Sequence, residues 1–104
     1  MDLLKVQELE EFSSENLIKK VPFINEKMRV ILLFFDPDQE LPLHQHENSH
    51  ELFYVMEGEG MLMMGEEEHR IEQGNLALAP MGTRHGLKTT QSQMKILAVQ
   101  APRP

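Results

Sequence analysis

Apolar residues along this chain occur in short runs that end at turn-forming residues. The run at 28–35 stops at the Asp-Pro-Asp sequence of 36–38, and the run at 51–56 stops just before Gly58. Short runs rich in β-branched and aromatic residues are typical of β-strands. Further strands are predicted at 61–64, 69–72, 76–79 and 94–100. Strands separated by turn signals every ~8–12 residues predict an all-β sandwich or barrel.

We interpret the 104 residues as a single domain spanning 1–104, because no repeat, low-complexity tract or linker divides them. A short loop at 65–67, between two predicted strands, is typical of a β-hairpin. Only the segment 6–20 has mixed periodicity, so it could hold a short helix.

An excess of acidic side chains excludes several classes of partner. The chain has 10 Lys and Arg residues against 17 Asp and Glu residues, a formal charge of −7 with His neutral. Nucleic acids and anionic membrane surfaces both require a basic face, so we expect neither as a partner. Cysteine is absent, which excludes disulfides, thiol nucleophiles and iron–sulfur clusters. No secretory signal is recognisable and no apolar run could cross a bilayer, so we expect a soluble, cytoplasmic protein.

Three histidines and one glutamate are the main candidates for chemistry. His44 and His46 are two residues apart, which on a strand places both on one face. Glu51 follows closely, and His85 comes much later in the chain. Imidazole and carboxylate are ligand types that Fe(II), Mn(II), Ni(II) and Zn(II) accept. The His-x-His pair alone is a weak signal, and the alternative is that all four are polar surface residues of a β-protein.

The spacing around these four residues resembles that of the cupin superfamily. The first cupin motif, G-x5-H-x-H-x4-E-x6-G, is matched at His44, His46, Glu51 and Gly58. The second motif, G-x5-P-x-G-x2-H-x3-N, is matched at Gly74, Pro80, Gly82 and His85. Two positions depart from the pattern: Asp38 stands where the first glycine belongs, and Thr89 replaces the final asparagine.

The resemblance implies a double-stranded β-helix, also called a jelly roll or cupin barrel, with its core at about 28–98. It also implies one divalent ion, Fe, Mn, Ni or Zn, held inside the barrel by His44, His46, Glu51 and His85. The similar cupins include dioxygenases, isomerases and decarboxylases. We therefore expect a metal-dependent enzyme acting on an oxygen-rich small molecule, with Glu51 as a catalytic residue. The alternative is a non-catalytic module that binds or senses a metabolite.

The alternation of side chains along 51–56 predicts which neighbours of Glu51 share its face. If Glu51 points into the barrel, so do Phe53 and Val55, whereas His50 points outward and is not expected to be a ligand. The expected apolar wall of a small-molecule pocket consists of Phe53, Val55, Met63 and Leu78. The outward residues Leu52, Tyr54 and Met56 form an apolar stripe. Such a stripe predicts a homodimer, the common state of the similar small cupins.

Overall fold

The chain folds into a curled antiparallel β-sheet, and the computed structural model describes residues 2–104. Within them lie eight strands and a short 3₁₀ turn, Val6–Glu8. The strands are β1 (Ile18–Ile24), β2 (Arg29–Phe35), β3 (Glu40–His44), β4 (His50–Met64), β5 (Glu67–Glu72), β6 (Leu76–Ala79), β7 (His85–Lys88) and β8 (Met94–Ala101). Their order is β1-β2-β8-β4-β7-β3, with β5 and β6 both paired to β4. No helix within 2–104 is long and apolar enough to cross a membrane.

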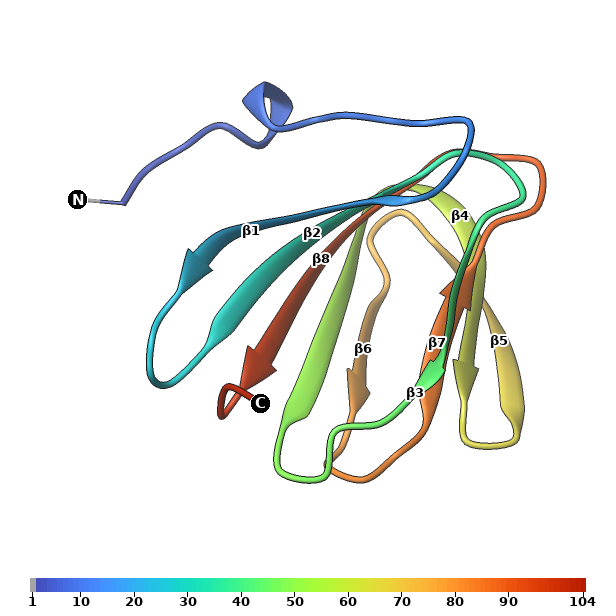
Figure 1. The fold of residues 1–104 in the computed structure, drawn as a ribbon. Coiled ribbons are helices and arrows are strands. Elements are labelled where there is room, and N and C mark those ends of the chain that lie inside the picture. The colour runs from blue at the N-terminus through green and yellow to red at the C-terminus, as the bar shows by residue number, and fades with distance from the viewer. Residues whose placement is uncertain (1) are drawn as a thin grey trace.

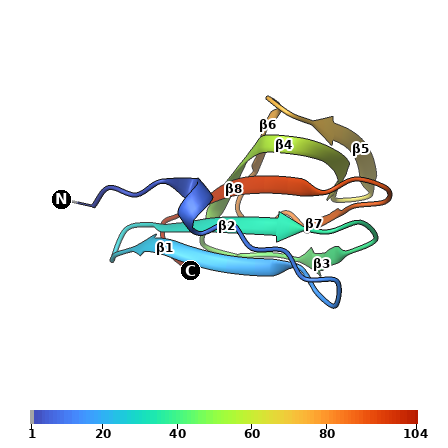
Figure 2. The ribbon, with the colours of Figure 1, turned by 90° about the horizontal axis from the view of Figure 1, so that it is seen from above.

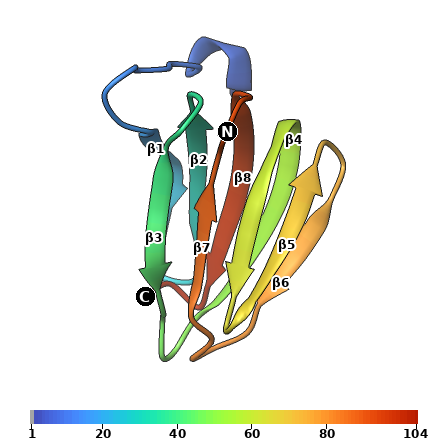
Figure 3. The ribbon, with the colours of Figure 1, turned by 90° about the vertical axis from the view of Figure 1, so that its right-hand side faces the viewer.

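The long strand β4 joins the two halves of the fold. Its first part, up to Gly58, pairs with β8 and β6, and its last part, from Glu59, pairs with β5 and β7. Between Val55 and Glu57 the register with β8 shifts, and an irregularity of this kind bends a strand and increases its twist. The sheet therefore curls into two facing walls (Figures 1 and 3). This is the double-stranded β-helix expected from the sequence.

The hydrophobic core lies between the two walls. Its inward residues include Ile31, Leu33 and Phe35 from β2 and Met94, Ile96 and Ala98 from β8. The other face of β2 is also buried, because the N-terminal segment passes over it (Figure 2). There the rings of Phe12 and Phe34 meet edge to face, with centroids 5.8 Å apart. Burial on both faces explains why residues 30–35 are apolar without a break.

Two positions that depart from the sequence motif still build its turns. Asp38, in place of the first glycine, has φ 59° and so adopts the left-handed conformation that glycine favours. Asp is one of the few other residues that enter this region at modest cost. The Thr89 hydroxyl donates to the Asp36 carbonyl (2.6 Å) and accepts from the Gln39 N–H (3.1 Å). Thr89 therefore ties the end of β7 to the turn that precedes β3.

The sequence pattern does not predict β1, β3 or β7. These strands are short or mix charged with apolar residues, and β1 and β3 each contain a proline. The helix considered for 6–20 is reduced to the 3₁₀ turn Val6–Glu8, and β1 already begins at Ile18. The predicted strands at 51–56 and 61–64 are two parts of β4.

Candidate metal centre

Four side chains that are far apart in the sequence converge at one end of the barrel. His44 ends β3, His46 lies in the loop that follows, Glu51 is near the start of β4, and His85 begins β7. Their ligand atoms all lie within 4.8 Å of one another. Because β3 pairs with β7 in a register that places His44 opposite His85, these two rings are 4.3 Å apart between centroids. The structure thus brings together the four residues that the sequence predicts as metal ligands, which we call the His/Glu cluster.

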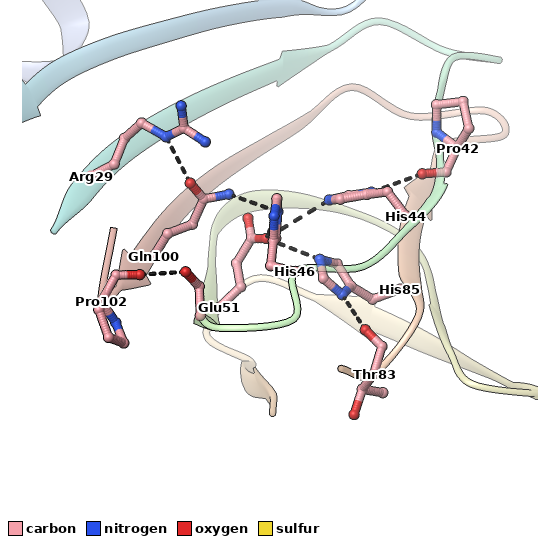
Figure 4. A network of polar contacts seen from close by, with 10 residues as sticks. Arg29, Pro42, His44, His46, Glu51, Thr83, His85, Gln100 and Pro102 are labelled. Carbon is pink, nitrogen blue, oxygen red and sulfur yellow. Dashed lines mark hydrogen bonds and ion pairs between the residues drawn. The ribbon is translucent and has the colours of Figure 1, made fainter. Parts of the chain in front are cut away.

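Glu51 lies at the centre of the His/Glu cluster (Figure 4). Its Oε1 is 2.9 Å from His85 Nε2, 3.5 Å from His46 Nε2 and 3.8 Å from His44 Nε2. The side chains of Glu51 and His85 are buried, whereas those of His44 and His46 are 32% and 21% exposed. The cluster is therefore closed behind Glu51 and His85 and accessible on the side of His44 and His46.

Backbone carbonyls orient two of the imidazole rings. Nδ1 of His44 is 2.9 Å from the carbonyl oxygen of Pro42, and Nδ1 of His85 is 2.9 Å from that of Thr83. A carbonyl oxygen can only accept, so each Nδ1 carries a proton. Nε2 of His85 lies 2.9 Å from Oε1 of Glu51. If this nitrogen carries no proton, its lone pair faces the carboxylate oxygen. Two acceptors this close need a positive charge between them, either an added proton or a metal ion.

Gln100 and Arg29 continue the polar network from the cluster toward β2. The Nε of Arg29 donates to Oε1 of Gln100 (2.7 Å), which leaves the amide nitrogen of Gln100 facing His46 Nε2 at 3.2 Å (Figure 4). Arg29 and Gln100 are register partners on β2 and β8, so their side chains leave the sheet on the same face. The ring of His46, which lies in a loop, is therefore contacted by a buried side chain that Arg29 holds in place.

The environment of Glu51 keeps its carboxyl group ionised. Burial alone would raise the pKa of Glu51, but the neighbouring side chains of His44, His85 and Gln100 outweigh burial and lower this pKa to about 2. The nearby carboxylate of Glu51 raises the pKa of His44. Burial and the neighbouring imidazoles lower the pKa of His46, so its ring is neutral near pH 7. The carboxylate of Glu51 and the ring of His46 are thus in the protonation states that metal binding requires, whereas the raised pKa of His44 means that a proton competes with the metal there.

His50, the histidine next to Glu51, lies outside the His/Glu cluster. Its side chain is exposed, and its Nδ1 accepts a hydrogen bond from the backbone N–H of Met81 (3.2 Å). The outward orientation predicted from strand alternation is therefore confirmed. His50 is also a matched control for the ligands, because it is the same residue type in the same part of the chain.

The residues predicted as an apolar pocket wall do not line the cavity beside the cluster. Phe53 and Val55 point inward, as expected, but belong to the hydrophobic core, where the Phe53 ring packs against His85 at 5.6 Å between centroids. Leu78 is 55% exposed. It lies opposite Leu52 in the β4–β6 pair, and residues directly opposite each other share a face, so Leu78 points outward with Leu52.

Met63 faces away from the core because of the irregularity in β4. Before it, odd-numbered residues such as Phe53 and Val55 are buried; after it, the buried residues are the even-numbered Gly60 and Leu62. An extra residue in a strand reverses the alternation of its side chains. If side chains alternated without interruption from Glu51, Met63 would point inward, whereas in the structure it points outward.

A cavity of about 290 Å³ opens beside the His/Glu cluster. His44, His46 and Glu51 line one part of it, and Ile31 and Leu33 contribute to an apolar wall. The cavity thus offers a ligand both apolar surface and direct access to the cluster, a combination typical of small-molecule sites.

Three polar residues that line this cavity are not identified from the sequence: Lys19, Arg29 and Gln100. A signal for two of them exists. Arg29 continues the inward phase of Ile31 and Leu33 on β2, and Gln100 continues that of Ala98 on β8. A polar residue at an inward position of an apolar strand indicates a functional or strongly hydrogen-bonded site. Lys19 gives no such signal, because β1 is not predicted.

Comparisons with known proteins find similar sequences and similar solved structures. The profile of the cupin domain family matches residues 31–100. The crystal structure of TT1209 from Thermus thermophilus has a TM-score of 0.94 and 34% identity, over 100% of both chains. The oxalate-binding protein of Thermotoga maritima is 24% identical over 90 residues, 86% of this chain and 74% of that protein. The uncharacterized protein MJ1618 of Methanocaldococcus jannaschii is 30% identical over 61 residues, 58% of this chain and 49% of its own, so the chain matches about half of that relative.

Proposed function

Because the chain belongs to the cupin domain family, we propose that it is a metal-dependent enzyme that acts on a small oxygen-bearing molecule. The convergence of His44, His46, Glu51 and His85 within 4.8 Å carries this proposal. The cavity beside them supplies the space for a substrate. A cytoplasmic location without nucleic-acid or membrane partners belongs to the same proposal.

The donor atoms of the His/Glu cluster fit a divalent ion. Three imidazole nitrogens and one carboxylate oxygen suit Fe, Mn, Ni and Zn. Neighbouring ligand atoms about 2.1 Å from such an ion are about 3.0 Å apart in an octahedral site and about 3.4 Å apart in a tetrahedral one, close to the 2.9 Å and 3.5 Å from Glu51 Oε1 to His85 Nε2 and His46 Nε2. The need for a positive charge between these two atoms supports the same assignment. All four residues of the cluster would hold the ion.

The residues around the cavity can assist a reaction of the dioxygenase, isomerase or decarboxylase type. When bound, the ion would polarise an oxygen atom of the substrate or, as Fe, support oxidation. The ionised carboxylate of Glu51 can accept a proton from a substrate that enters the cavity. The amide nitrogen of Gln100, oriented by Arg29, can donate a hydrogen bond to a substrate oxygen. Phe53 closes the cluster from behind and excludes water.

A non-catalytic binding or sensing module is the second candidate function. The name of the oxalate-binding protein of Thermotoga maritima describes binding rather than turnover. Both candidates use the same cluster and cavity, because a binding module also needs ligands that hold a metal and space beside them. They differ in whether Glu51 transfers a proton.

Turnover by metal-loaded protein distinguishes the two candidates. We expect protein loaded with Fe(II), Mn(II), Ni(II) or Zn(II) to convert at least one enediol, diketone or aromatic diol. We expect Glu51→Gln to reduce this turnover by a factor of about 100 or more while retaining part of the metal, because the amide cannot accept a proton. Substrate loss and elemental analysis measure the two effects. Binding without turnover in all four metal forms would favour the binding module, and no binding in any form would contradict both.

An apolar patch on the outer face of the barrel supports a homodimer. Leu52 and Tyr54 are 38% and 40% exposed, and their partners on β6, Leu78 and Leu76, are 55% and 66% exposed. Contiguous apolar side chains on the surface of a small protein favour an interface. We expect light scattering at micromolar concentration to give the mass of a dimer, and Leu78→Lys to shift it to a monomer. A monomeric mass for the unmodified chain would contradict this proposal.

A further inference from the structure

Two cationic side chains line the cavity without a carboxylate partner. Lys19 lies opposite Leu33 in the β1–β2 pair and shares its inward face, whereas the next residue, Lys20, points outward and pairs with Glu11 at 2.8 Å. Arg29 is hydrogen bonded through Nε to Gln100. In the part of the chain that the structure describes, no Asp or Glu oxygen lies within 4.0 Å of the charged groups of Lys19 or Arg29.

The charges around the cavity leave an excess of positive charge. Glu51 supplies the acidic side chain of the lining, and its Oε1 is already engaged by Nε2 of His85 at 2.9 Å. Lys19 and Arg29 line the same cavity as His44, His46 and Glu51. A divalent ion in the cluster would add to this excess. An anionic ligand is therefore favoured over a neutral or cationic one.

The remaining wall of the cavity is apolar. Ile31, Leu33, Leu41 and Leu43 line it together with Pro42. A volume of about 290 Å³ lies at the lower limit of the ~300–1,000 Å³ typical of ligand pockets, so the ligand is a small molecule. Apolar surface of this kind contributes affinity only to a ligand that carries hydrocarbon of its own.

We infer that the ligand of this cavity is a small organic carboxylate with an apolar body. Its carboxylate binds to Lys19 and to the terminal nitrogens of Arg29, and its hydrocarbon part packs against Ile31, Leu33 and Leu41. A guanidinium group held at Nε presents its other N–H groups in a geometry that matches a carboxylate. The inference rests on the proposed function for the location of the ligand, but it holds whether or not the ligand is turned over.

Matched pairs of carboxylates and amides test this inference. We would measure by calorimetry the binding of isovalerate, hexanoate and benzoate to metal-loaded protein, each beside its amide, which has a similar shape without the charge. At least one carboxylate is expected to bind about 10- to 100-fold more tightly than its amide, the range for hydrogen bonds to charged groups. The Lys19→Gln, Arg29→Gln double variant is expected to lose this preference. Lys20→Gln, which removes a neighbouring outward charge, is the matched control and is expected to retain it.

The outcomes separate this inference from the proposed function. Equal affinity for every carboxylate and its amide, no measurable binding of any carboxylate, or a preference that survives in the double variant would overturn the inference. Metal content, measured by elemental analysis in the same samples, tests the His/Glu cluster independently. A charge preference in protein that takes up no metal supports the inference and contradicts the proposed function. Metal uptake and turnover of a neutral substrate without a charge preference support the proposed function and contradict the inference.

Discussion

A His44→Ala, His85→Ala double variant is expected to bind a divalent metal ion at least about a thousandfold more weakly than the unmodified chain. The two rings lie 4.3 Å apart on paired strands and supply half of the four ligands. Alanine at both positions leaves Glu51 and His46, and two ligands do not hold a transition metal against water and buffer. Elemental analysis of protein purified without added metal, followed by calorimetric titration, would measure the loss.

The control for this prediction is His50→Ala, which removes an exposed imidazole outside the cluster and is expected to leave metal affinity unchanged. Affinity in the unmodified chain is expected to fall as the pH is lowered, because protons compete with the metal for imidazole nitrogen. The raised pKa of His44 means that this competition begins at a higher pH than for an ordinary histidine. Full metal content in the double variant would show that the His/Glu cluster is not the metal site.

The ligand set could be predicted from the sequence because residue type and spacing together constrain it. The reason for the proximity of His44 and His46 differs from the prediction, however. β3 ends at His44, so His46 reaches the cluster from a loop, where Gln100 contacts its ring, and not through the alternation of one strand. In the structure, the His-x-His spacing of the motif corresponds to the end of a strand, at His44, followed by a loop that contains His46. Strand alternation alone does not describe this geometry.

The pocket wall could not be predicted, because it depends on a register that the sequence does not reveal. The shift between Val55 and Glu57 changes the face of every later residue of β4, Met63 included. Lys19, one of the two cations that line the cavity, could not be predicted for a related reason. Lys19 is inward only because β1 pairs with β2 in the observed register, and such pairing between strands is set by the whole sheet.

Replacing Gly58 with alanine is expected to destabilise the fold by more than about 4 kcal/mol, a large fraction of the stability of a small domain. Gly58 has φ 85°, a conformation that L-residues rarely adopt. An added Cβ would also lie 2.0 Å from the carbonyl oxygen of Gln93 and 2.9 Å from Cα of Met94. These are backbone atoms at the start of β8, which pairs with β4 at this point, so they cannot move aside without separating the two strands.

The matched control for Gly58→Ala is Gly65→Ala in the hairpin between β4 and β5. Gly65 also has a positive φ, 61°, but a Cβ there would meet no atom within 4 Å. Its replacement should therefore cost only the conformational strain, about 1–2 kcal/mol. Urea unfolding of both variants, with the slope checked for constancy, separates the two contributions. Equal losses would mean that the contact between Gly58 and Gln93 yields easily, and that β4 and β8 are not held rigidly where β4 bends.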